Sequence, residues 1–239
     1  MKKPDDKKVL LYSGGMDSYI LLKMFDYDEI LFFKMGNEDN LKELEFIQKV
    51  PELKERIRVI DMPLGQFELE NKILPYRNHI LALMAANFGN KIYLGFTKGD
   101  TTKDKDYVYK SQIEGILNYF SLDTMKVAHQ LYPYEICIPF KYMTKADMLR
   151  MYLEAGNDYK ELLTNSRSCY SGDDKECGKC SSCLRKFTSF TVNYIDIRYH
   201  FAEDPVQFLD AFLEESIRKG RHEEVQEIEE TIKKLKDNN

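Results

Sequence analysis

The chain has 239 residues, of which 43% are hydrophobic and 31% are charged, and its formal net charge is −5. This length suits one domain with a small additional lobe, and the composition is that of a soluble globular protein. The acidic balance excludes the broad basic surface of a dedicated duplex-binding protein, so we expect no direct nucleic-acid binding. We find no apolar run long enough to span a membrane and no secretory leader, and therefore expect a cytoplasmic protein.

The first half of the chain alternates short apolar runs with helical patterns. Runs rich in aliphatic residues predict buried strands over residues 9–12, 29–34, 56–61 and 91–95. Helical periodicity predicts helices over residues 18–25, 40–49 and 78–88. This alternation predicts an α/β fold, a Rossmann-like doubly wound parallel sheet with helices on both faces.

The second half is predicted to be mainly helical. A helix over 110–120 and a last strand over 134–138 complete the sheet domain, which we expect to occupy residues 1–145. Residues 146–239 then form a C-terminal helical lobe. Thr144 followed by Asp147 is typical of a capping box that opens a helix reaching about Glu154. Asp204 before Pro205 predicts a further helix start, with the helix running through Ser216.

The charged tail over residues 221–236 carries an apolar stripe on one helical face. Its members are Val225, Ile228, Ile232 and Leu235. We expect this helix to pack along the stripe against its own chain, and a homodimer contact is the alternative use of the stripe.

A glycine-rich turn joins the first strand to the first helix, with the sequence Tyr12-Ser13-Gly14-Gly15-Met16-Asp17-Ser18. Two glycines allow close approach of the backbone to a ligand, and the N-terminus of the following helix offers N–H groups to an anion. The carboxylate of Asp17 would repel a phosphate unless Mg²⁺ bridges the two or Asp17 caps the loop. The turn predicts a phosphate-binding loop, and it lacks the Gly-Lys-Ser/Thr end of a Walker loop.

Four of the five cysteines lie in one short segment, with the spacing Cys-x7-Cys-x2-Cys-x2-Cys. They are Cys169, Cys177, Cys180 and Cys183. Four thiolates in one loop suit a tetrahedral metal, and zinc is the first candidate. Disulfides are the alternative, which the reducing cytosol disfavours. A closed four-thiolate zinc site has no open position for substrate, so we expect a structural role.

The glycine-rich turn resembles the PP-loop of the ATP pyrophosphatase superfamily. The cysteine segment resembles the zinc loop of one family within it, the 7-cyano-7-deazaguanine synthases, or QueC family. Three further segments agree in order, namely Leu74–Asn78, Ile92–Gly95 and Pro139–Asp147. The resemblance covers about residues 8–190 and implies the HUP type of Rossmann-like fold, as in adenine nucleotide α-hydrolases, with a zinc-binding C-terminal lobe.

This resemblance implies a carbon–nitrogen ligase of queuosine biosynthesis. Such an enzyme uses ATP, with Mg²⁺, to convert 7-carboxy-7-deazaguanine and ammonia to 7-cyano-7-deazaguanine (preQ0) through adenylated intermediates. The implied nucleotide-binding residues are Tyr12, Ser13, Gly14, Gly15, Met16, Asp17, Ser18 and Gly95. The candidate catalytic residues are Asp17, Arg77 and Lys145, since positive charge is needed where charge builds on the α-phosphate. For Arg77 a structural salt bridge is the alternative, and for Lys145 an exposed position in a first helical turn.

The chain also departs from the family. Where the family usually carries Tyr-Gly-Gln-Arg-His, this chain has Met35-Gly36-Asn37-Glu38-Asp39, and Lys98–Tyr107 replaces a Ser-Gly-Tyr-Pro-Asp-Cys-Arg-like loop. Both segments follow strands, where open α/β sheets bind ligands, so the identity of the acceptor stays open. The alternatives are a divergent branch that transfers the activated carboxylate to another amine, a tRNA-modifying PP-loop enzyme, and a non-catalytic nucleotide-binding or zinc-ribbon protein.

Overall fold

The computed structural model describes residues 6–100, 102–124, 133–171 and 175–237. The chain forms two compact units. The first comprises residues 1–13, 21–96 and 100–141, and the second comprises residues 14–20, 97–99 and 142–239. Residue 101, in the altered segment after the fourth strand, and residues 172–174, in the cysteine loop, lie outside the described residues.

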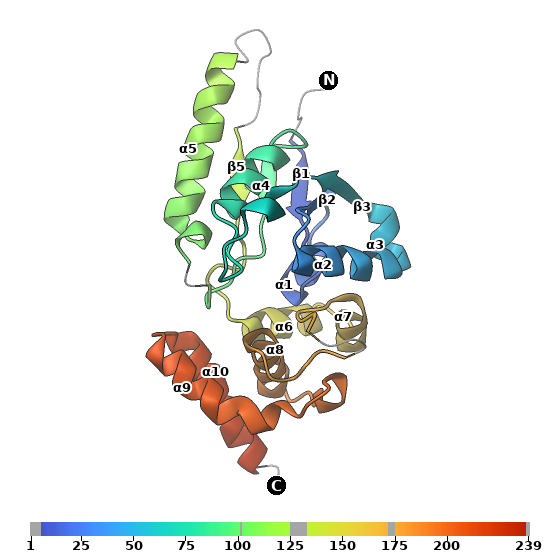
Figure 1. Ribbon diagram of the computed structural model, residues 1–239, viewed down its shortest axis with the longest axis vertical. Coiled ribbons are helices and arrows are strands. Elements are labelled where there is room, and N and C mark those ends of the chain that lie inside the picture. The colour runs from blue at the N-terminus through green and yellow to red at the C-terminus, as the bar shows by residue number, and fades with distance from the viewer. Residues whose placement is uncertain (1–5, 101, 125–132, 172–174, 238–239) are drawn as a thin grey trace. The chain divides into compact units, whose positions relative to one another are not determined.

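A five-stranded parallel sheet with the order β3-β2-β1-β4-β5 forms the centre of the first unit (Figure 1). Its strands are β1 (Lys8–Leu11), β2 (Glu29–Lys34), β3 (Ile57–Asp61), β4 (Lys91–Tyr93) and β5 (Glu135–Cys137). The predicted strands are confirmed, with small shifts at their ends. The strand order reverses between β1 and β4, and doubly wound sheets bind their ligands at the carboxyl ends of the strands flanking such a switch point.

Five α-helices begin in the segments between or beside these strands. They are α1 (Met16–Met24), α2 (Glu38–Lys49), α3 (Pro51–Arg56), α4 (Arg77–Ala85) and α5 (Tyr107–Thr124). Helix α3 was not predicted; it is a short helix that starts with Pro51 at its first position, where the missing N–H costs no hydrogen bond. Short 3-10 turns over Leu64–Phe67 and Lys103–Lys105 complete the connections.

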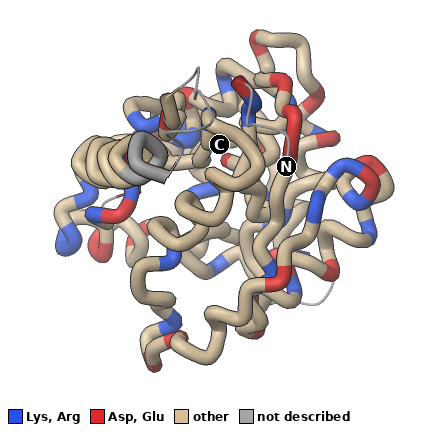
Figure 2. Tube along the Cα trace, turned by 90° about the horizontal axis from the view of Figure 1, so that it is seen from above, with Lys and Arg blue, Asp and Glu red and all other residues tan. Residues whose placement is uncertain are grey.

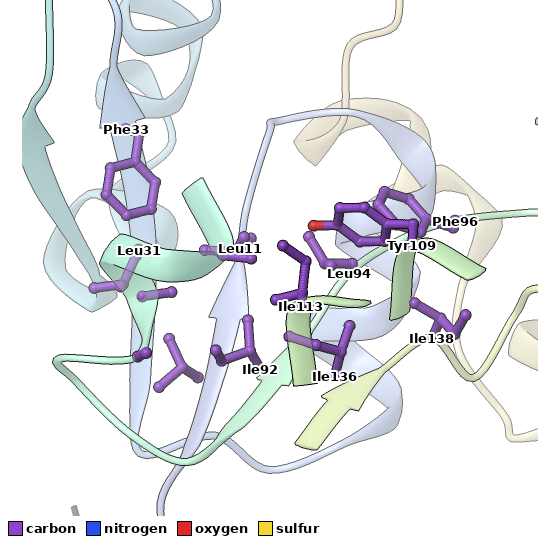
Figure 3. Packing of buried hydrophobic residues seen from close by; sticks show 14 of the residues in the cluster. Leu11, Leu31, Phe33, Ile92, Leu94, Phe96, Tyr109, Ile113, Ile136 and Ile138 are labelled. Carbon is purple, nitrogen blue, oxygen red and sulfur yellow. The ribbon is translucent and has the colours of Figure 1, made fainter. Parts of the chain in front are cut away.

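Both faces of the sheet are buried. On one face, Leu11, Leu31 and Ile136 of the strands pack in one cluster with Tyr109 and Ile113 of α5 (Figure 3). Neighbouring strand residues such as Leu10 and Phe32 are 0% and 1% exposed. Since successive residues of a strand point to opposite faces, these side chains are buried on the other face. The predicted doubly wound architecture, with cover on both sides, is confirmed.

The second unit is mainly helical. Its helices are α6 (Lys145–Glu154), α7 (Tyr159–Asn165), α8 (Ser181–Val192), α9 (Leu209–Arg218) and α10 (His222–Asp237), with 3-10 turns over Arg198–His200 and Pro205–Phe208. The predicted capping box of Thr144 and Asp147 is present at the start of α6. Asp204 does cap a helical turn, but Pro205–Phe208 is a 3-10 turn that leads into α9 rather than part of one continuous helix.

Helix α10 buries a different set of side chains from the predicted apolar stripe. Its buried residues are Glu224, Ile228 and Thr231, whereas Val225 and Ile232 are half-buried. The polar members are held by hydrogen bonds, as the contacts of Glu224 with Ser216 and Arg221 illustrate. Apolar periodicity alone therefore does not identify the buried face of this helix.

Basic and acidic residues are interspersed along the trace (Figure 2). A search of the described residues finds no helix that combines the length and the apolar character needed to cross a membrane.

Candidate functional site

The glycine-rich turn leaves β1 and leads directly into α1. Gly14 has φ 77°, a left-handed conformation that a residue with a side chain adopts only with strain. Ser18 is 3% exposed, and its hydroxyl donates to the Gly15 carbonyl oxygen at 2.9 Å. Tyr12 and Met16 are buried, while Ser13 is exposed. The turn thus presents backbone and Ser13 at the start of a helix, the arrangement that favours an anion.

Asp17, in the first turn of α1, is paired with Lys145 at the first position of α6. The ammonium group of Lys145 contacts both carboxylate oxygens of Asp17. The Asp17 side chain is 24% exposed and the Lys145 side chain is 14% exposed, so the pair is partly withdrawn from solvent. Lys145 therefore neutralises the carboxylate that would otherwise repel a phosphate in this loop. An exposed position for Lys145, the alternative considered for it, is wrong.

Two further contacts tie the turn to the segment before the cysteines. The backbone N–H of Arg167 donates to the Gly14 carbonyl oxygen at 2.9 Å. The Tyr19 hydroxyl donates to Glu161 at 2.8 Å and accepts from the Asn165 amide at 3.1 Å. Since Arg167 lies two residues before Cys169, this hydrogen bond connects the glycine-rich turn to the segment that leads into the cysteine loop, within one unit.

The four predicted cysteines converge in the second unit, where their Sγ atoms all lie within 4.8 Å of one another. The Cys177–Cys183 and Cys180–Cys183 sulfur distances are 3.8 and 3.5 Å. Four sulfurs at about 2.3 Å from one tetrahedral ion lie about 3.8 Å apart, so the cluster fits zinc. Hydrogen bonds from the Cys180 and Cys183 thiols lower the pKa of the Cys169 thiol.

The backbone of the cysteine loop is closely packed. Gly178 has φ 84°, and a Cβ atom at this position would lie 2.0 Å from the Glu203 carbonyl oxygen. A glycine is therefore required between the second and third cysteines.

A buried ion pair supports the cysteine cluster from one side. Glu176 and Lys186 are each 2% exposed at their side chains and form a salt bridge. The Glu176 carboxylate also accepts from the Ser168 backbone N–H at 2.9 Å and lies 3.8 Å from the Cys183 sulfur. Burial raises the pKa of Glu176, but the Lys186 charge and the hydrogen bonds outweigh it and hold the pKa at about 2.

Arg77 and Gly95 belong to the first unit. Arg77 is the first residue of α4, after Tyr76, whose φ is 58°. Burial raises the pKa of Glu43 to about 7, while the Asn40 hydrogen bond and the positive charge of Arg77 oppose the rise. Gly95 follows β4 and is half-buried. Arg77 is thus a half-buried cation near a carboxyl group whose charge is poorly solvated.

Asn78 has a structural task. Its side-chain amide donates to the Asp104 carboxylate at 2.7 Å, and its backbone carbonyl oxygen accepts from the Tyr109 hydroxyl at 2.7 Å. The residue is 6% exposed. Helix α4 starts at Arg77, one residue before the predicted start, and Tyr76 holds the cap position.

Several residues of the site were not singled out from the sequence. Arg167 contributes a backbone group, and any residue type but proline could supply it. Glu176 is an acid in a charged segment, and no spacing rule separates a buried acid from an exposed one. The one signal in the sequence for Glu176 is that it directly precedes Cys177.

The chain is similar to known proteins along most of its length. A family model described as queuosine biosynthesis protein QueC matches residues 40–194, well over half of the chain. The chain is also similar to proteins named 7-cyano-7-deazaguanine synthase. The Hahella chejuensis protein is 30% identical over 79% of this chain and 90% of its own length. The Pseudoalteromonas atlantica protein is 28% identical, with 84% and 98% covered. A Colwellia psychrerythraea protein, 7-cyano-7-deazaguanine synthase 1, is 28% identical, with 85% and 99% covered.

Proposed function

The chain belongs to the family of the queuosine biosynthesis protein QueC, and from this premise we propose that it is an ATP-dependent 7-cyano-7-deazaguanine synthase. Its substrates are 7-carboxy-7-deazaguanine, ammonia and ATP, and its product is preQ0, the nitrile precursor in queuosine biosynthesis. The observation that carries the proposal is the Asp17–Lys145 pair, which makes the turn after β1 acceptable to a polyphosphate.

The proposed reaction activates one carbon atom twice. A carboxylate oxygen of the substrate attacks the α-phosphorus of ATP, and the bond to the β-phosphate oxygen breaks to release pyrophosphate. Ammonia attacks the carbonyl carbon of the acyl-adenylate, AMP leaves, and a proton is lost to give the amide. The amide oxygen then attacks a second ATP in the same way. Loss of AMP, with the two N–H protons passing to base, leaves the nitrile.

We assign the phosphate cradle to the turn from Ser13 to Ser18. The N–H groups at the start of α1 and the Ser13 hydroxyl would donate hydrogen bonds to the phosphates, and Lys145 balances the charge of Asp17 beside them. Mg²⁺, carried with ATP, would spread the charge of the leaving pyrophosphate. Arg77 is our second candidate for contact with phosphate or carboxylate.

We propose a structural role for zinc bound by the four cysteines. The backbone bond from Arg167 to Gly14 supports this role, because a loop fixed by the metal then fixes the phosphate-binding turn. We retain residues 1–145 as the nucleotide-binding domain and 146–239 as the zinc-binding lobe. Reduced thiolates and a supply of ATP suit the cytoplasm, where we place the enzyme.

The direct test supplies purified protein with ATP, Mg²⁺, ammonium and 7-carboxy-7-deazaguanine and identifies products by mass spectrometry. We expect the nitrile together with AMP and pyrophosphate. Amide as the sole product, or a carboxylate transferred to another amine, would indicate the divergent branch. Absence of any pyrophosphate release would overturn the ligase proposal. Metal analysis should give zinc, and a visible absorbance band with iron would instead indicate an iron–sulfur tRNA enzyme.

Asp17→Asn tests the assignment of the turn. Removing the carboxylate takes away the contact that holds the Lys145 ammonium beside the turn, so we expect turnover to fall by about 100-fold or more. Asp26→Asn, a change of the same kind just after α1, is the matched control and should retain turnover. Full activity of Asp17→Asn would contradict the assignment.

A further inference from the structure

Helix α10 begins beyond residue 194, where the match to the family model ends, yet it reaches the start of α6. The Glu227 carboxylate accepts a hydrogen bond from the backbone N–H of Ala146 at 3.0 Å. Ala146 is the second residue of α6 and directly follows Lys145. The residues matched by the family model therefore do not include Glu227. Its contact with Ala146 lies one residue from Lys145, the proposed cation of the phosphate site.

Glu227 is placed to hold the first turn of α6. The first N–H groups of a helix have no partner within the helix, and a carboxylate there also meets the positive end of the helix dipole. Burial raises the pKa of Glu227, while the Thr144 and Ala146 hydrogen bonds and the charges of Arg185 and Lys145 stabilise its ionised form. In the capping box the Asp147 N–H donates to the Thr144 hydroxyl, so Thr144 and Glu227 accept from different N–H groups of the first turn of α6.

The same face of α10 holds two more basic residues of this unit. Glu224 is 5% exposed, and its Oε1 atom lies 2.7 Å from Arg185 Nε. Glu223 lies 3.5 Å from Lys98, whose backbone N–H donates to the Met143 carbonyl oxygen just before α6. A Cβ atom on Gly99 would lie 2.6 Å from the Arg185 guanidinium. The start of α6 is thus bound both directly by Glu227 and indirectly through Lys98.

We propose that Glu227 is a positioning residue for ATP binding, which acts by fixing the first turn of α6 so that Lys145 stays on Asp17. This inference rests on the proposed role of Lys145 at the phosphate site. The other end of α10 is anchored independently, because Lys234 donates to the Val192 carbonyl oxygen at 2.5 Å and lies 3.7 Å from the Tyr194 ring centroid. Loss of Glu227 should therefore loosen α6 without releasing α10.

The test is a double-mutant cycle on ATP affinity, measured by calorimetry without the carboxylate substrate. We expect Glu227→Ala to weaken ATP binding by roughly tenfold, as for loss of one charge-assisted hydrogen bond. Glu227→Gln keeps an acceptor for the Ala146 N–H and should stay within about threefold of the parent protein. In a Lys145→Met background, Glu227→Ala should add less than about twofold, because both changes act through Lys145.

Glu229→Gln is the matched control, since Glu229 is exposed on the same helix, and it should bind ATP as the parent does. Zinc content and melting temperature are measured for each variant, so that a misfolded protein is recognised. Unchanged affinity in Glu227→Ala, or effects of Glu227→Ala and Lys145→Met that simply add, would overturn the proposal. ATP binding without product formation would count against the proposed function alone, because the cycle does not use the reaction.

Discussion

The two units of this protein bury different kinds of side chain. In the first unit, Val9, Ile92 and Ile136 of the sheet are all 0% exposed, and the buried polar side chains there are neutral amides such as Asn90. In the second unit, Glu176, Lys186 and Glu224 are buried as ionised or ionisable groups. Among the residues that the structure describes, every buried charged residue belongs to the second unit.

This difference separates two sources of stability. Apolar burial is non-directional and tolerates small shifts, so the sheet needs no specific partner. A buried charge is stable only while its partner is in place, and removal of the partner leaves an uncompensated ion. The second unit therefore depends on specific pairings of its buried charges, whereas the sheet of the first unit does not.

Metal removal should have the largest effect, because it should unfold the second unit while the first unit stays folded. Structural zinc contributes on the order of 10 kcal/mol to the folding of small zinc domains, so a strong chelator should unfold the second unit. We expect circular dichroism to lose helix signal, and hydrogen exchange to show the sheet of the first unit still protected. Cys183→Ser should act like the chelator, while Cys137→Ser, a change in β5 outside the cluster, should retain zinc. One unchanged unfolding transition after chelation would contradict this view.

Breaking the buried ion pair should come next in size. Lys186→Met removes the lysine counter-charge of the buried Glu176 carboxylate, which should cost about 3–5 kcal/mol of unfolding free energy. The double variant Lys186→Met with Glu176→Gln should recover much of that loss, because no isolated charge remains. Lys179→Met removes an exposed pair with Glu203 and should cost at most about 1 kcal/mol. Urea titrations followed by circular dichroism measure all three, and equal losses in Lys179→Met and Lys186→Met would refute the distinction.

The smallest effect concerns Glu43, a carboxyl group of the first unit whose pKa lies near neutrality. Burial raises the pKa of Glu43 from 4.5 to about 7, so the folded state holds its proton more tightly than the unfolded state. Its contribution to stability is then complete below pH 4.5 and lost as the pH rises through 7. We expect a decrease of about 1–2 kcal/mol in unfolding free energy, since the side chain keeps some contact with solvent.

Glu43→Gln should remove this pH dependence, and Glu45→Gln, on an exposed neighbour, should leave it intact. Urea titrations at pH 5 and pH 8 make the comparison. Equal slopes of stability against pH in the parent and in Glu43→Gln would show that Glu43 does not titrate in this range.

The sequence was a good guide wherever a local pattern carries the information. Strand β2 was predicted at its observed bounds, since Glu29–Lys34 is a continuous apolar run between polar ends. The cysteine spacing predicted a cluster that the sulfur distances confirm as one site. The Thr144–Asp147 capping box was predicted because its two partners lie three residues apart.

Local pattern could not supply contacts between distant segments. Lys145 and Asp17 are separated by 128 positions, and neither segment indicates the other. Helix α8 escaped prediction because its first turn contains a metal-site cysteine, so the motif concealed the helix. The buried face of α10 was missed for a related reason, since Glu224 and Thr231 are buried by polar partners that only the fold supplies.

The discontinuous make-up of the second unit sets an order of events during synthesis on the ribosome. Residues 14–20 emerge early, but Lys145, Glu161 and Arg167, which they contact, emerge more than 100 residues later. At about 5–20 residues per second, the turn waits for several seconds or longer without these partners. A nascent chain can pair β1 with β2 during that time, yet the contacts of the glycine-rich turn with Lys145, Glu161 and Arg167 form only after these residues have been made.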